Sequence, residues 1–265
     1  MAAKQTVLIT GGSGGLGLAM AKIMAERGYE VVVCGRTPAM LAQAKAEAPA
    51  LTVIQADVAR AEDRDRLMAA FADGCPDMLI NNAAINRAHD YTNDFTLGSD
   101  RARAEIDINF AAPVELTRLY LAARRKAGHD PRPGTIVMVG TPGALFPLEA
   151  IPLYSATKAG LHMFTLVLRR QMRGTAVKVL EVFPPALDTG LAPDLNVASQ
   201  AANGADVIAQ VAAETIDAIE AGQEIILPHP QARGLVASFP PMDEAVVDAA
   251  NKGVGRRTGW DAGGQ

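Results

Sequence analysis

The sequence has few cysteines and no long hydrophobic run, and each shortage excludes a class of protein. Its two cysteines, Cys34 and Cys75, lie in or beside apolar segments and form no CxxC or metal-ligand spacing. We therefore expect two buried free thiols rather than a disulfide framework, and the four scattered histidines suggest no metal site. Only Met1–Lys4 precede the first apolar run, which is too short for a secretory segment or a membrane span. These features predict a cytoplasmic protein with no membrane partner.

Aromatic residues and basic runs are also scarce. Aromatic residues make up 5% of the chain and hydrophobic residues 49%, so its 265 residues can bury a large aliphatic core. The formal net charge is -4 without a long basic run, so nucleic acid is not expected as a partner. The one basic cluster, Arg124–Lys126, precedes Gly128, where cations complement the dipole of a helix end. The composition is that of a soluble globular protein.

Short apolar runs alternate with helical patterns along most of the chain. Strands are expected at 5–10, 29–34, 51–56, 77–81, 134–139, 176–183 and 224–228, and helices near 15–27, 38–47, 61–72, 99–127, 153–173 and 204–221. Because the runs are apolar throughout, the strands are expected to be buried on both faces, as in a parallel sheet covered by helices. The pattern predicts an α/β fold with a doubly wound parallel sheet, the Rossmann fold, in three α/β/α layers. We expect a single domain over residues 1–249, and a Gly-rich tail over 250–265 that is disordered or lies at an oligomer interface.

A glycine-rich segment follows the first expected strand and opens the first expected helix. It reads Thr10-Gly-Gly-Ser-Gly-Gly-Leu-Gly17. Glycines at these positions permit a tight turn, close approach of the backbone to a pyrophosphate, and tight packing of the helix on the sheet. The free N–H groups and partial positive charge of the helix N-terminus favour an anion. We therefore predict that the following residues bind a dinucleotide: Gly11, Ser13, Gly14, Gly15, Leu16 and Gly17.

The end of the second expected strand carries Arg36 and no carboxylate. Rossmann proteins that bind NAD usually place an acidic residue here for the ribose 2'-hydroxyl. A guanidinium can instead pair with a 2'-phosphate, which a carboxylate would repel. The sequence therefore favours NADP over NAD as cofactor. A solvated Arg36, or one stacked on the adenine, would leave both cofactors usable.

Tyr154 and Lys158 stand four residues apart in a helical pattern, so their side chains leave the same helix face. A positive charge about 4 Å from a phenol is worth on the order of 4 kcal/mol at an effective dielectric of about 20, or roughly three units of pKa before the cost of desolvation is subtracted. We expect Lys158 to lower the pKa of Tyr154, so that the pair can serve as acid and base near neutral pH. Taken alone, a tyrosine and a lysine at this spacing are more often an amphipathic surface pair. A catalytic role for them therefore depends on the other motifs of the chain.

The glycine loop together with Tyr154-Ser-Ala-Thr-Lys158 resembles the short-chain dehydrogenase/reductase family over roughly residues 5–190. The resemblance implies that Asp57 and Val58 contact the adenine, and that Asn82 and Ala83, within a segment similar to the family's NNAG, also bind the cofactor. It further implies that Tyr154 and Lys158 are catalytic and that both contact the cofactor. The segment 139–147 and the helix that follows look closest to a branch of reductases named for a D-alanine-transfer operon.

The catalytic positions depart from the family at Thr141, where a serine is usual. Threonine keeps the hydroxyl, so it can still donate to a substrate carbonyl oxygen. Its β-branch and the following Pro142 favour an extended backbone, which either holds the hydroxyl more rigidly or aims it elsewhere. We predict a catalytic role for Thr141, and a loop cap is the alternative.

Pro184 and Thr189 are the other cofactor contacts that the resemblance implies. The family usually has Pro-Gly where this chain has Pro184-Pro185, and Thr189 is the candidate for the nicotinamide amide. An ordinary loop cap is the alternative role for Thr189.

Asn109 resembles the asparagine of the family's catalytic tetrad, and Pro113 follows it by four residues. Pro113 has no N–H to donate to the Asn109 carbonyl, so the helix is expected to kink there and free that carbonyl. In the family the corresponding carbonyl holds a water that links the lysine to solvent. A simple kink, with the carbonyl satisfied elsewhere, is the alternative.

These motifs predict hydride transfer between a nicotinamide and a small carbonyl or alcohol substrate, with Tyr154 passing the proton. Segments 143–153 and 186–203 are expected to line or cover a partly hydrophobic substrate pocket. An NAD-dependent alcohol dehydrogenase of the same family, or a dinucleotide-binding regulator with weak or no catalysis, are the alternatives. By resemblance the chain is expected to form a homo-oligomer, either dimer or tetramer, through helices 99–127 and 153–173.

Overall fold

The computed structural model of the chain describes residues 4–72, 74–92, 99–130, 132–192, 204–239 and 243–253. These residues form one parallel sheet in the order β3-β2-β1-β4-β5-β6-β7. The strands are β1 (Thr6–Thr10), β2 (Glu30–Gly35), β3 (Thr52–Gln55), β4 (Met78–Asn81), β5 (Gly134–Val139), β6 (Val177–Val182) and β7 (Ile225–Ile226). The chain winds outward in both directions from the β1/β4 junction, so the predicted single-domain Rossmann fold is confirmed.

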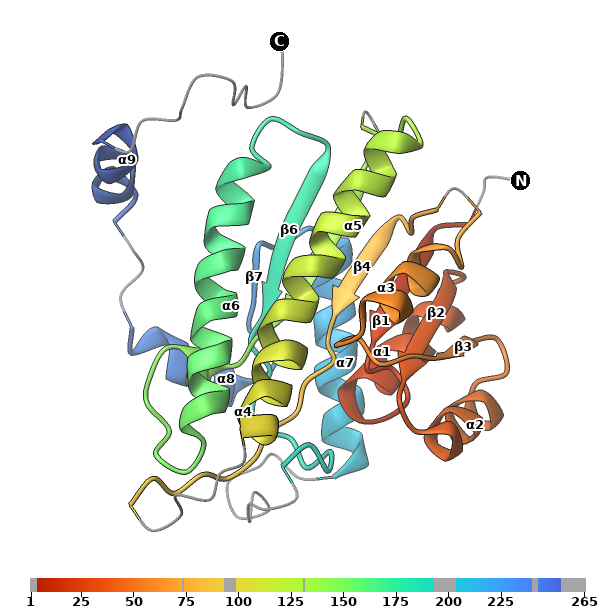
Figure 1. Ribbon diagram of the computed structural model, residues 1–265, viewed down its shortest axis with the longest axis horizontal. Helices are drawn as coiled ribbons and strands as arrows, with labels where there is room; N and C mark the ends of the chain where they lie inside the picture. Colours follow the sequence, from red (N-terminus) through yellow and green to blue (C-terminus); the bar gives the residue numbers. More distant parts are fainter. Residues whose placement is uncertain are drawn as a thin grey trace.

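Helices cover both faces of the sheet and complete the three layers (Figure 1). One face packs against α1 (Gly15–Glu26) and α7 (Ala205–Glu220), while α2 (Pro38–Glu47) lies beside β2 and β3. The other face packs against α3 (Ala61–Met68), α5 (Ala112–Lys126) and α6 (Pro152–Gln171). In the central strands, alternate residues enter the two cores, for example Val137 on the first face and Ile136 on the second. This two-sided burial explains why the strands read as continuous apolar runs.

The predicted helix at 99–127 is three segments. It consists of α4 (Ser99–Ile106), a π-helical turn over Asp107–Ala111, and α5. The backbone N–H of Ala112 donates to the carbonyl of Asp107, five residues earlier, which is the π-helical pattern. Pro113, the second residue of α5, has no N–H, so the hydrogen-bond ladder breaks where the sequence predicts a kink.

Two helices near the C-terminus were not expected from the sequence. They are α8 (Pro230–Ala237) and α9 (Glu244–Gly253), which have only 8 and 10 residues. Helix α9 crosses the expected boundary between residues 249 and 250, so the first part of the proposed tail is helical. Arg170 of α6 holds α9 through ion pairs to Glu244 and Asp248. Residues 254–265 lie outside the described residues.

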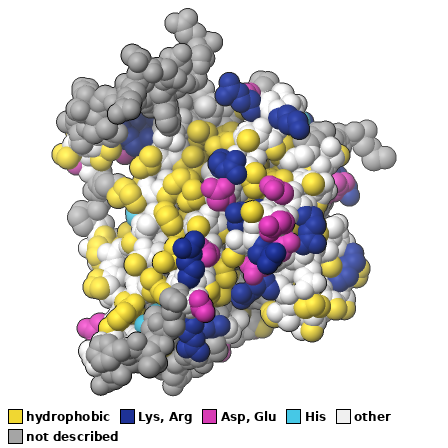
Figure 2. Space-filling view, viewed as in Figure 1, with side chains coloured by type: hydrophobic (Ala, Val, Ile, Leu, Met, Phe, Trp, Pro, Cys, Tyr) yellow, Lys and Arg dark blue, Asp and Glu magenta, His cyan; other side chains and the backbone are white. Residues whose placement is uncertain are grey.

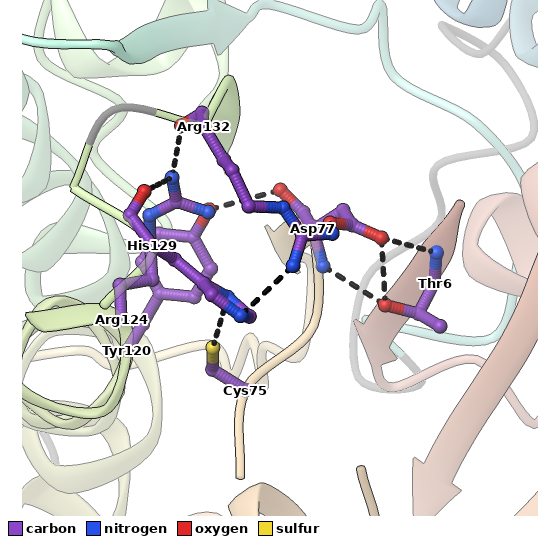
Figure 3. Close-up of polar contacts among 7 residues, drawn as sticks. All are labelled: Thr6, Cys75, Asp77, Tyr120, Arg124, His129 and Arg132. Atoms are coloured by element: carbon purple, nitrogen blue, oxygen red, sulfur yellow. Dashed lines mark hydrogen bonds and ion pairs between the residues drawn. The ribbon is translucent and has the colours of Figure 1, made fainter. Parts of the chain in front are cut away.

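A polar cluster closes the amino-terminal edge of the sheet (Figure 3). Arg124, from the basic cluster expected at a helix end, is only 1% exposed. Its guanidinium donates to the carbonyls of His129 and Arg132 and lies 5.5 Å from the centroid of the Tyr120 ring. A Cβ at Gly134 would come 2.5 Å from the Arg124 guanidinium carbon, so only glycine fits there. The cluster fixes the turn between α5 and β5.

Asp77 ties this cluster to the start of β1, and its removal is expected to destabilise the fold. Its carboxylate accepts from the backbone N–H of Thr6 at 2.9 Å and from the Thr6 hydroxyl at 3.0 Å. Asp77→Ala should lower the free energy of unfolding by about 2–3 kcal/mol, since hydrogen bonds to charged groups contribute about 1.5–3 kcal/mol each. Urea unfolding measures this loss. Asp65→Ala, at an exposed site on α3, is the control and should change it by less than about 0.5 kcal/mol. Equal losses of unfolding free energy in the two variants would show that the Asp77 hydrogen bonds do not stabilise the fold.

Candidate active site

The carboxyl ends of the central strands open into one groove of about 1050 Å³. It lies at the edge toward which the arrowheads of β4 and β6 point in Figure 1, beside the β1/β4 junction where ligands bind in such sheets. Of the residues selected from the sequence, those lining the groove are Gly11, Ser13, Gly14, Gly15, Leu16, Gly17, Arg36, Asp57, Val58, Asn82, Ala83, Thr141, Tyr154, Lys158, Pro184 and Thr189. Asn109 does not line it. The fold thus brings residues from seven separate segments of the sequence to one surface.

The glycine loop forms a cradle that side chains would fill. Gly11 and Gly15 have φ values of +65° and +53°, which favour glycine. A Cβ at Gly17 would come 2.5 Å from both the Gly11 carbonyl oxygen and the Asn82 amide nitrogen. Gly14 caps α1 without a side-chain hydrogen bond, so the first N–H groups of the helix face the groove without a side-chain acceptor. These features fit a pyrophosphate held by backbone N–H groups.

The side chain of Asn82 forms its hydrogen bonds with the glycine loop itself. Its side-chain amide donates to the carbonyls of Thr10 and Gly11 at 2.9 and 3.2 Å. The Thr10 hydroxyl accepts from the backbone N–H groups of Asn82 and Ala83, both at 3.0 Å. The end of β4 therefore fixes the shape of the glycine loop, a role that the motif alone did not reveal.

Arg36 stands exposed at the far end of the groove, after β2. Its backbone carbonyl accepts from Gln55, and in the described ranges no carboxylate forms an ion pair with its guanidinium. Asp57, on the neighbouring wall, already accepts from the backbone N–H of Ala59. This end of the groove therefore presents a cation that is available to a phosphate.

Tyr154 and Lys158 lie in the wall of the groove, one turn apart on α6. They are 7% and 2% exposed, and the Lys158 ammonium lies 5.7 Å from the centroid of the Tyr154 ring. The ammonium donates to the carbonyl of Val139 at 2.7 Å. Burial lowers the pKa of Lys158 to about 8, and the carboxylate of Glu181 partly opposes that fall. The pair is therefore a buried one, and the alternative of an exposed surface pair is excluded.

The expected lowering of the Tyr154 pKa is not observed in this structure. Burial raises that pKa above its usual range, and the nearby negative charge of Glu105 raises it further. The sequence indicates the charge of Lys158, but the size of the desolvation cost depends on how deeply the fold buries Tyr154. Tyr154 is consequently a neutral phenol at pH 7, the form that donates a proton.

Thr141 has the extended backbone that Pro142 imposes, with φ of -164° and ψ of 149°. Its hydroxyl oxygen accepts from the N–H of Gly143 at 3.3 Å and so caps a short 3-10 helix, Pro142–Ala144. Accepting this bond leaves the hydroxyl hydrogen able to donate into the groove, whose wall Thr141 shares with Tyr154. The capping role and the capacity to donate therefore coexist.

Asn109 lies behind the wall and is fully buried. Its side-chain oxygen accepts from the N–H of Ile85 at 2.8 Å, and its nitrogen donates to the Ile85 carbonyl and to the Thr157 hydroxyl. The side chain thus joins the segment after β4 to α6 rather than facing a substrate. The Thr157 hydroxyl in turn donates to the carbonyl of Tyr154 at 2.8 Å, so Asn109 supports the part of α6 that carries Tyr154.

Thr189 approaches the glycine loop across the groove. A Cβ at Gly15 would come 2.9 Å from the Thr189 Cβ, which shows that the two segments are in contact. The expected substrate segment 186–203 is described only as far as Ala192, and residues 193–203 lie outside the described residues. Gln231 and Leu235 of α8 also line the groove, although no motif indicated them. The ring of Phe239 stacks on that of Phe146 at 5.7 Å and holds the C-terminal segment against the substrate side.

The fold and the site together define a dinucleotide-binding oxidoreductase of the short-chain type. The family model for short chain dehydrogenases matches residues 5–200. The chain belongs to the short-chain dehydrogenase/reductase family, and it is an oxidoreductase.

Individual relatives agree with this placement. The uncharacterized oxidoreductase DltE of Bacillus subtilis is 42% identical over 70% of this chain and 73% of its own length. The NADP-dependent 3-hydroxy acid dehydrogenase YdfG of Escherichia coli K12 is 30% identical over 67% of this chain and 71% of its own. A 3-ketoacyl-(acyl-carrier-protein) reductase from Brucella melitensis, solved with NADH, is 23% identical, with a TM-score of 0.71 over 86% of this chain and 92% of its own.

No helix in the described ranges is long and apolar enough to span a bilayer.

Proposed function

We propose that this protein is an NADP(H)-dependent reductase that interconverts a small carbonyl compound and the corresponding secondary alcohol. The observation that carries the proposal is the burial of Tyr154 and Lys158 together in the wall that also carries Thr141, opposite the glycine cradle. A phenol and an ammonium are costly to bury, and such pairs concentrate at functional sites.

The residues of the wall have separate roles in this proposal. When bound, the nicotinamide supplies or accepts the hydride. In reduction, neutral Tyr154 donates its proton to the oxygen that becomes an alkoxide, and the Thr141 hydroxyl stabilises the same oxygen. The Lys158 ammonium would bind the hydroxyls of the ribose that carries the nicotinamide. By the family resemblance, the Asn109 carbonyl, which receives no N–H from Pro113, would hold a water in the path by which Tyr154 regains its proton.

Arg36 supports NADP rather than NAD as the cofactor. Its guanidinium stands at the end of β2, where the ribose of a bound dinucleotide would lie, and the YdfG relative is named as NADP-dependent. The Brucella neighbour was solved with NADH, so the fold itself accepts either dinucleotide. An NAD-dependent alcohol dehydrogenase is therefore the second candidate, and a substitution at Arg36 separates the two.

Arg36→Glu is expected to raise the Kd for NADPH by about tenfold or more, equivalent to 1.4 kcal/mol, because it replaces an attraction for the 2'-phosphate by a repulsion. The Kd for NADH should change by less than about threefold, since NADH has no 2'-phosphate. Fluorescence titration of each cofactor gives both values. Arg118→Glu makes the same charge change at an exposed site on α5 outside the groove and serves as the control. Similar losses for both cofactors would rule out a 2'-phosphate contact.

A stopped assay of NADPH oxidation against a panel of ketones and aldehydes tests the activity. A reductase oxidises NADPH only when a carbonyl compound is present. A dinucleotide-responsive regulator, which would keep the groove but not the chemistry, would bind NADPH and turn over none of the panel. The apolar residues on the substrate side of the groove, including Phe146, Leu148 and Ile151, favour partly hydrophobic carbonyl compounds.

We also propose a homo-oligomer formed through the face of α4 and α6. Ile106, Met163 and Val167 are 40%, 51% and 47% exposed there, and Figure 2 shows hydrophobic side chains gathered over α6. On the helices expected to form the interface, Leu116, Leu161 and Leu168 do not belong to this surface, because they are buried in the core of the chain itself.

A further inference from the structure

A second titratable pair lies behind Lys158, outside the groove. Glu181 of β6 is 1% exposed, and one of its carboxylate oxygens contacts the Nδ1 atom of His162 at 2.9 Å. His162 is on α6, four residues after Lys158, so it lies on the same helix face. Its side chain is 21% exposed and its ring meets that of Phe183 edge-on at 5.6 Å. None of these contacts takes part in the proposed reaction.

The second carboxylate oxygen of Glu181 is directed toward the segment that holds Lys158. This oxygen, Oε1, is buried and has no hydrogen-bond partner among the described residues. A Cβ at Gly140 would come 3.2 Å from it, so Oε1 lies against Gly140. The carbonyl that accepts from Lys158 belongs to Val139, the residue before Gly140. The ammonium contacts Val139 and the carboxylate oxygen lies against Gly140, so both groups are next to the same peptide segment at the end of β5.

We propose that Glu181, held by His162, is a positioning residue that keeps Lys158 charged in its buried site. The proposal rests on the proposed function, in which the Lys158 ammonium binds the cofactor. Burial disfavours the charged form of a lysine, and an opposite charge nearby favours it. Glu181 is the one group among the described residues whose charge raises the pKa of Lys158. His162 fixes the carboxylate from the side that reaches solvent.

The other charged groups near this site have different effects. Burial raises the pKa of Glu181, while His162, Arg169 and Lys158 oppose that rise. Glu105 is paired with His89 at 2.9 Å, and its charge raises the pKa of Tyr154. Burial raises the pKa of the Cys34 thiol, also in the groove, to about 12, so it does not titrate near pH 8. Glu105 serves as the matched control for Glu181. Like Glu181 it is a buried carboxylate with a histidine partner, but its charge acts on Tyr154 instead of Lys158.

The experiment is the pH dependence of NADPH binding, measured by fluorescence between pH 6 and pH 9.5. Lys158 is charged below its pKa of about 8, so affinity in the wild type should fall as the pH rises through that value. In Glu181→Gln the pKa of Lys158 should be lower, and the fall should move to lower pH by about one unit, the lower end of the effect of a close opposite charge. Glu181→Asp keeps the charge and should restore most of the wild-type curve, whereas Glu105→Gln should leave the position of the fall unchanged.

A thermal unfolding cycle at pH 7 tests the same coupling without cofactor or turnover. Glu181→Gln should lower Tm more in the wild type than in Lys158→Met, because only the wild type then has a buried lysine without its counter-charge. Additive changes in Tm, or a binding curve that stays in place in Glu181→Gln, would overturn the proposal. A different result would separate this inference from the proposed function. If no carbonyl compound of the panel is reduced but the NADPH binding curve of Glu181→Gln still shifts to lower pH, the proposed activity is overturned and the role of Glu181 stands.

Discussion

Tyr154→Phe is expected to lower kcat for carbonyl reduction by about a thousandfold, within the range of about 10² to 10⁴ for a positioned general acid. The substitution removes only the hydroxyl that we propose as the proton donor. The ring stays in the wall of the groove, where Tyr154 is 7% exposed and lies near the Lys158 ammonium. The Kd for NADPH should therefore change by less than about threefold, equivalent to less than about 0.7 kcal/mol. Steady-state turnover and fluorescence titration on one preparation separate the two effects.

Tyr120→Phe is the matched control for this experiment. Tyr120 is also a buried tyrosine, but its hydroxyl donates to the carbonyl of Asp77 in the cluster at the opposite edge of the sheet. Its loss should reduce stability without changing kcat by more than about twofold, because the substitution does not touch the groove. Turnover that persists in Tyr154→Phe would mean that another group supplies the proton.

Gly17→Ala is expected to raise the Kd for NADPH by about tenfold or more, equivalent to at least about 1.4 kcal/mol. The new methyl would come 2.5 Å from the Gly11 carbonyl oxygen and from the Asn82 amide nitrogen. Both atoms belong to the hydrogen bond that shapes the loop, at 3.2 Å, so the loop must open to admit the methyl. Fluorescence titration measures the affinity, and a thermal melt checks that the variant is folded.

Gly160→Ala controls for the general effect of alanine in a helix. Gly160 lies inside α6, where the nearest atoms to an added Cβ are those of the Phe110 ring at 3.5 Å, an ordinary contact. Alanine is favoured over glycine in a helix interior by about 1 kcal/mol, so this variant should be as stable as the wild type or more so. It should also keep the wild-type affinity for NADPH. Unchanged affinity in Gly17→Ala would show that the loop does not cradle the cofactor.

Much of the fold could be predicted from local patterns. The strands were recognisable because a parallel sheet with two covered faces requires continuous apolar runs, as in Val31–Cys34 and Ile136–Val139. The glycine loop was recognisable because positive φ at Gly11 and Gly15 and close packing at Gly17 require glycine. The kink at Pro113 follows from one missing N–H. Each of these features depends on neighbours in the sequence or on the chemistry of a single residue.

The features that could not be predicted depend on distant segments meeting in the fold. The direction of the Tyr154 pKa depends on burial and on Glu105, which is 49 residues earlier in the sequence. Glu181 and His162 carry no motif, and only the pairing of β5 with β6 places that carboxylate beside the segment that binds Lys158. Asn109 was selected from a family motif, but the sequence could not show that its side-chain hydrogen bonds to Ile85 and Thr157 also support α6. Burial and tertiary contact, rather than propensity, decide all three.

The most direct test of the account follows the hydride. NADPH carrying deuterium at both C4 positions of the nicotinamide is incubated with the protein and, in turn, with each member of the carbonyl panel, and the products are analysed by mass spectrometry. The account predicts an alcohol with deuterium on the carbinol carbon in the wild type, and about a thousandfold slower formation of that product in Tyr154→Phe. NADPH that binds tightly while no deuterium reaches any member of the carbonyl panel would contradict the account and favour a dinucleotide-binding regulator.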